Sequence, residues 1–106
     1  MLMNTQLQSI IAQIEAGQYK EAYNALNVMR KDPTLPDEIV EVAEIASIEI
    51  GVTEKRRQFE PNGGFYAKCA VLRLQEASGD PYAAERLRQL KEQMNLTLDA
   101  QLNSRN

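Results

Sequence analysis

The chain has 106 residues, of which 43% are hydrophobic and 25% charged, a composition typical of one globular domain and not of a disordered segment. Its formal net charge is −3, so it lacks the cationic excess with which most proteins bind nucleic acid. It has no histidine and one cysteine, Cys69, which excludes an intrachain disulfide and a Cys/His zinc site.

Two short amphipathic helices are expected before residue 33. Their apolar residues recur every three or four positions, which is the spacing of one helical face. The stripe of the first helix comprises Leu7, Ile10, Ile11 and Ile14, and that of the second comprises Tyr19, Ala22, Leu26 and Met29. Gly17 ends the first helix, and Pro33 ends the second because the residue before a proline disfavours helical backbone.

The third predicted helix begins near Pro36 and is apolar over most of its circumference. Thr34 with Asp37 approximates a capping box at its start. Its apolar positions are Ile39, Val40, Val42, Ala43, Ile45, Ala46, Ile48, Ile50 and Val52. A helix this apolar packs on two sides, so we interpret it as the central helix. It either breaks at Gly51 or continues to about Phe59.

The clearest loop is Pro-Asn-Gly-Gly at 61–64, and two more helices follow it. The fourth helix ends at Ser78-Gly79, after which Asp80 suits an N-cap and Pro81 suits the first position of a fifth helix. The apolar stripe of the fourth helix comprises Phe65, Cys69 and Leu72 with Val71 and Leu74 beside it, and that of the fifth comprises Ala83, Leu87, Leu90 and Met94.

An internal repeat links the first and third helices. The segments 11–17 and 45–51 both read I-A-x-I-E-x-G, and their glycines are 34 residues apart, the period of the tetratricopeptide repeat (TPR). The sequence G-Q-Y-K-E-A at 17–22, followed by Asp32-Pro33, resembles the TPR stretch G-x-Y-x-E-A that leads to a closing D-P. The match covers about residues 5–51 and is degenerate beyond them.

This resemblance implies an all-α fold of antiparallel helical hairpins, a TPR-like right-handed repeat of about five helices. Residues 1–94 would form the TPR-like domain, and residues 95–106 a C-terminal tail or a short capping helix. An unrelated helical bundle is the alternative. The length, the G-x-Y-x-x-A hairpin and the late Asp80-Pro81 before a helix ending in Lys91-Glu92-Gln93 also resemble small TPR-like chaperones of type III secretion, which hold needle subunits as monomers.

Residue types that support catalysis are sparse. Histidine, the usual general base near neutral pH, is absent. Cys69 lies in an apolar stripe and is expected in the core, whereas Glu38, Glu41 and Glu44 are expected to form a solvated acidic face on the third helix. We therefore expect a protein that is not an enzyme, with no catalytic residue, cofactor or metal site.

The one basic run is Lys55-Arg56-Arg57, at the end of the third predicted helix. Cations there complement the helix dipole, which is the simpler interpretation. The run can also contact an acidic partner, and Arg86, Arg88 and Lys91 would then extend it.

Binding of another protein is the function that the pattern favours. TPR arrays need three or more repeats, so a shorter one leaves apolar surface for a partner to cover. We predict a groove that accepts an amphipathic helix, as in a chaperone or adaptor. The candidate partner-binding residues are Ile10, Ile14, Tyr23, Ile45, Ile48 and Leu72. The sequence does not separate groove positions from core positions.

Two alternatives remain open at the level of sequence. One is a homo-oligomeric structural or regulatory protein, in which the apolar surface meets its own copy. The other, less favoured, is a nucleic-acid-binding regulator. The chain begins without a cationic and apolar leader, and no stretch approaches about 18 consecutive apolar residues. We therefore expect a cytoplasmic protein with no contact to membranes.

Overall fold

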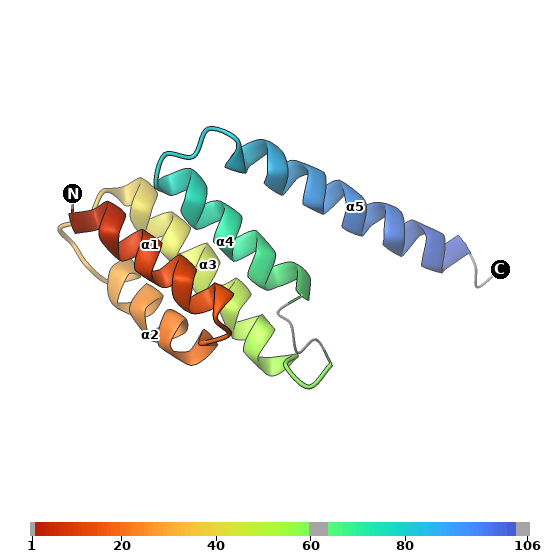
Figure 1. Ribbon diagram of the computed structural model, residues 1–106, viewed down its shortest axis with the longest axis horizontal. Helices are drawn as coiled ribbons and strands as arrows, with labels where there is room; N and C mark the ends of the chain where they lie inside the picture. Colours follow the sequence, from red (N-terminus) through yellow and green to blue (C-terminus); the bar gives the residue numbers. More distant parts are fainter. Residues whose placement is uncertain (1, 60–63, 104–106) are drawn as a thin grey trace.

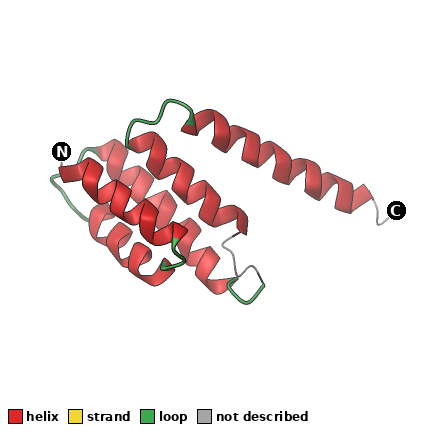
Figure 2. Cartoon of the chain, in the orientation of Figure 1, coloured by secondary structure: helices red, strands yellow, loops and turns green. Residues whose placement is uncertain are grey.

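The computed structural model describes residues 2–59 and 64–103, and every regular element within these ranges is a helix (Figures 1 and 2). The five helices are α1 (Leu2–Glu15), α2 (Tyr19–Arg30), α3 (Asp37–Lys55), α4 (Gly64–Ala77) and α5 (Ala83–Asn103). The predicted all-α fold of five helices in successive hairpins is confirmed.

The first four helices form a closed bundle, and α5 packs outside it. Helix α1 contacts α2 and α4, α3 also contacts α2 and α4, and α5 contacts α4 alone among the described helices. The apolar stripes predicted from the sequence meet in the centre of this bundle, because each amphipathic helix buries its apolar face. The largest fully buried apolar side chains are Leu7, Leu26, Ile50, Leu74 and Cys69.

Glycines make the two tightest turns, at the ends of α1 and α4. Gly17 has φ of 79° and Gly79 has φ of 104°, left-handed values that side chains with a Cβ rarely adopt. At the first turn the Gly17 N–H donates to the Ile14 carbonyl at 3.0 Å, and the Gln18 N–H donates to the Gln13 carbonyl at 2.8 Å. This pair of bonds is a Schellman motif, which satisfies carbonyls at the helix end. The predicted stops at these glycines are thus confirmed.

The sequence left two ends open for α3, a break at Gly51 or a continuation to about Phe59, and the structure decides between them. Helix α3 does not break at Gly51 but continues to Lys55, with turns at 56–59. The glycine that matches Gly17 in the repeat is therefore inside a helix. At the start of α3 the predicted capping box is wrong, because the N-cap is Pro36 without a side-chain bond. The Thr34 hydroxyl and N–H instead donate to Asp32.

Helix α5 is longer than expected and extends beyond the bundle. It runs without a break past residue 94, where the sequence predicted the domain to end, to Asn103 (Figure 1). Its 21 residues correspond to about 31 Å, compared with about 21 Å for the 14 residues of α4. The molecule is accordingly elongated, with extents of 52 × 30 × 21 Å. Most of the predicted 61–64 loop lies outside the described residues.

Candidate functional site

A hollow on the surface lies between α1, α4 and α5. It exists because α5 rests on α4 without contacting α1, so a strip of α4 between them stays open. Its volume is about 550 Å³, within the range of small-molecule pockets. We call it the α4 groove, and it is lined by Ile14, Glu15, Tyr19, Ala67, Lys68, Val71, Leu72, Arg86, Gln89, Leu90 and Gln93.

The floor of the α4 groove is apolar because α4 buries only part of its apolar surface in the bundle. Ala67, Ala70 and Leu74 point into the core and are at most 5% exposed. Val71 and Leu72 come directly after Ala70 in α4, so they lie on other sides of the helix, and they are only half-buried. Leu90 of α5 is half-buried as well and forms the facing wall. Apolar side chains thus remain open to solvent along both helices.

The rim of the α4 groove is polar and mainly cationic. Lys68 and Arg86 contribute positive charges, and Glu15 contributes the one carboxylate of the lining. Arg86 is held at the rim, since its guanidinium lies 3.8 Å from Asp80 and 6.0 Å from the centre of the Tyr82 ring. An apolar floor with a charged rim is the usual anatomy of a protein-binding surface.

The six residues predicted to bind a partner do not form one surface. Ile14 and Leu72 line the α4 groove, although Ile14 is only 3% exposed. Ile10 belongs to the core, also at 3% exposure. Tyr23 and Ile48 border a hollow between α2 and α3, at 39% and 61% exposure. Ile45 borders another between α3 and α4.

Most residues that line the α4 groove were not among the partner-binding residues predicted from the sequence. Val71 and Leu90 were assigned to the apolar stripes of their helices, where nothing distinguishes a core position from a groove position. Lys68 is an ordinary surface cation in the sequence, and Arg86 was considered only as an extension of the basic run Lys55-Arg56-Arg57. The distinction arises only from the placement of α5, which contacts one helix and leaves its neighbour uncovered. The only local signal for the α4 groove is that Val71 and Leu72 are adjacent apolar residues, which widens the apolar face of the predicted fourth helix.

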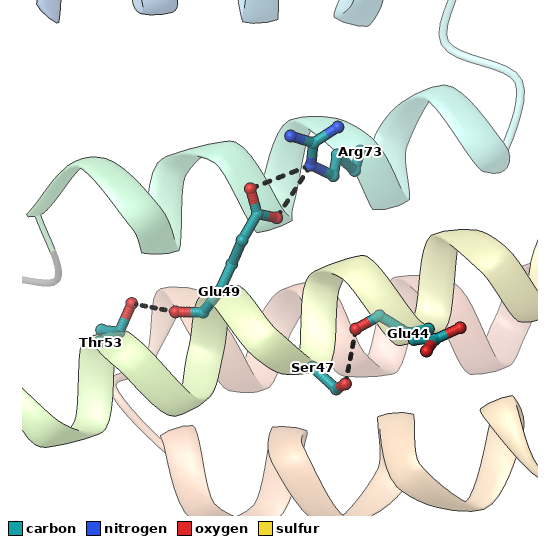
Figure 3. A network of polar contacts seen from close by, with 5 residues as sticks. All are labelled: Glu44, Ser47, Glu49, Thr53 and Arg73. Atoms are coloured by element: carbon teal, nitrogen blue, oxygen red, sulfur yellow. Dashed lines mark hydrogen bonds and ion pairs between the residues drawn. The ribbon is translucent and has the colours of Figure 1, made fainter.

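A polar contact inside the fold joins α3 to α4. The Arg73 Nε donates to both carboxylate oxygens of Glu49, at 2.9 and 3.0 Å (Figure 3). Burial raises the pKa of Glu49, and the hydrogen bond and charge of Arg73 offset part of that rise. Burial, with the nearby Glu49 charge, also raises the pKa of the Cys69 thiol, which is 1% exposed. A protonated, buried thiol is a poor nucleophile.

The chemistry of the α4 groove suits noncovalent binding. Its lining consists of aliphatic side chains, one tyrosine, two amides and surface charges. No group of three or more His, Cys, Asp or Glu side chains in residues 2–59 and 64–103 is placed to hold a metal ion. No helix within these same ranges is both long and apolar enough to cross a membrane.

Comparisons of the chain with protein families, with curated proteins and with solved structures find no match.

Proposed function

We propose that the protein is a non-enzymatic binding module, a chaperone or adaptor, that holds an amphipathic helix of another protein in the α4 groove. The observation that carries the proposal is the open apolar strip of Val71, Leu72 and Leu90 between α1 and α5. The TPR-like hairpin and the likeness to small type III secretion chaperones make a secreted helical subunit the first class of partner to test.

The dimensions of the α4 groove suit a helix. From Arg86 to Gln93 its lining extends along α5 for about 10 Å, which is two helical turns. A partner helix of that length presents anchors at positions i, i+3 or i+4, and i+7. Covering the exposed parts of Val71, Leu72 and Leu90 stabilises the complex by roughly 1 kcal/mol each. Such anchors are enough for selective binding when the rim adds complementary charge.

The rim favours partners with acidic residues beside their apolar face. Lys68 is exposed and lies on the α4 side, and Arg86 is exposed and lies on the α5 side. A carboxylate on either flank of the partner helix would meet one of them. Charge complementarity of this kind acts mainly on selectivity and on the association rate.

The test compares two groove variants with one control in co-purification from an extract of the native host. We expect Leu90→Glu and Lys68→Glu to lose the bound partner, with the larger loss for Leu90→Glu. Val28→Glu is the control, because Val28 is 71% exposed on α2 and lies outside the α4 groove. Circular dichroism must show that the variants keep their helical signal. Equal retention of the partner by all three variants contradicts the proposal.

A further inference from the structure

The outward face of α3 has exposed apolar side chains between charged ones. Glu41, Ile48 and Lys55 are spaced by seven residues, two helical turns, so they form one straight row. Ile45 and Val52 flank Ile48 at the neighbouring helical positions. We call these five residues the α3 stripe. Ile48 is 61% exposed and Ile45 is 43% exposed, which is high for isoleucine in a folded domain.

The α3 stripe has carboxylates at one end and an amine at the other. Glu41 precedes Ile48 by seven residues and Lys55 follows it by seven, so each of these two charges is about 10 Å from the centre. Glu44, four residues before Ile48, is exposed on the same face and adds to the acidic end. The side chains of Glu41 and Lys55 are exposed, and neither forms an ion pair with another residue in the described part of the chain. From its N-terminal to its C-terminal end the α3 stripe therefore has acidic, apolar and basic residues in that order. An antiparallel copy presents the reverse order.

We propose that the α3 stripe binds a second copy of the chain, with the two α3 helices antiparallel across a two-fold axis at Ile48. In this arrangement Glu41 of each copy faces Lys55 of the other, and the two Ile48 side chains pack together at the axis. Such self-complementarity is the defining property of an isologous interface. A parallel pair of α3 helices would instead place Glu41 against Glu41 and Lys55 against Lys55, which repel.

The expected dimer is weak and depends on concentration. Two crossing helices bury less surface than a standard protein–protein interface, although Tyr23 of α2 borders the same side of α3 and is 39% exposed. The α3 stripe is separate from the α4 groove, since they share no residue. Failure of the self-association proposal would therefore not contradict the partner-binding proposal, and the reverse also holds.

Charge reversal tests the antiparallel geometry. Sedimentation equilibrium of the full chain, up to near-millimolar concentration, gives the dimer dissociation constant. We expect Glu41→Lys and Lys55→Glu each to raise that constant at least about tenfold, because each turns two attractive pairs into two repulsive ones. The double variant Glu41→Lys/Lys55→Glu should restore it. Within one chain these positions are about 21 Å apart, so the rescue reports contact between copies.

A cysteine at the axis gives an independent readout. Ile48→Cys should form an intermolecular disulfide on mild oxidation, because the axis places residue 48 beside its own copy. Val28→Cys is the matched control and should not, and the native Cys69 is buried. A wild-type protein that stays monomeric at every concentration overturns the proposal. So does a dimer whose double variant is not restored, or one in which both cysteine variants cross-link equally.

Discussion

Removing Arg73 should destabilise the fold strongly, because it leaves a buried carboxylate without its partner. The Glu49 side chain is 10% exposed and the Arg73 side chain 21% exposed, and the two are joined at 2.9 Å between α3 and α4 (Figure 3). Breaking a buried pair costs about 3–5 kcal/mol, and we expect the lower end, about 3 kcal/mol, since the charge of Lys91 also favours ionised Glu49.

The assay is thermal and urea unfolding of Arg73→Met, which retains most of the side-chain volume. A loss of about 3 kcal/mol should lower Tm by at least about 12 °C in a domain of this size. Arg88→Met is the matched control, since Arg88 pairs with Glu85 and Glu92 on the exposed face of α5, and its Tm should hardly change. The double variant Glu49→Leu/Arg73→Met should recover most of the stability.

The pH dependence of this variant follows from the pKa of Glu49. Burial raises that pKa in the folded state, and loss of Arg73 raises it further. The folded protein then binds a proton more tightly than the unfolded chain, so the stabilisation from protonated Glu49 is present at low pH and is lost as pH rises through the raised pKa. The deficit of Arg73→Met against wild type should shrink on acidification. A deficit that is independent of pH, or no larger than that of Arg88→Met, would refute the reasoning.

Three further predictions concern the helical core and its turns. Ala22→Asp should unfold the protein or lower its stability by several kcal/mol, because Ala22 is fully buried, while Asn24→Asp on the exposed face of α2 should not. Gly17→Ala should cost about 1 kcal/mol, since its φ of 79° strains any Cβ although space is open. Gly51→Ala should be neutral or stabilising by up to about 1 kcal/mol, because it lies inside α3 and its Cβ would be 3.5 Å from the Tyr23 ring, an ordinary contact. Chemical denaturation measures all four variants, and equal effects at the two glycines would contradict our account of the turns.

The sequence predicted the helices well because their signals are local. The stripes ending at Gly17 and Gly79 have the 3.6-residue period, and each glycine has the left-handed backbone that such a stop requires. Gly51 was harder to interpret, because the residues before it match those before Gly17 but its backbone is helical. Helix α2 packs against α3, and a Cβ added at Gly51 would lie 3.5 Å from the Tyr23 ring.

The binding surfaces could be predicted only in part, because they depend on which helices meet. Ile10 and Ile48 are both isoleucines on amphipathic helices, yet one is 3% exposed and the other 61% exposed. The breadth of the apolar face on α3 did indicate two-sided packing. The α4 groove had no comparable signal in the sequence, since it forms because α5 contacts α4 but does not contact α1.

Methyl NMR of the complex tests the central claim most directly. The labelled protein is titrated with the isolated helical segment of a co-purified partner, and the shifts of its Ile, Leu and Val methyl groups are followed. We predict that the perturbed methyls cluster at Ile14, Val71, Leu72 and Leu90, the aliphatic lining of the α4 groove. Perturbations confined to Ile45, Ile48 and Val52 on α3, with the α4 groove unchanged, would contradict the account.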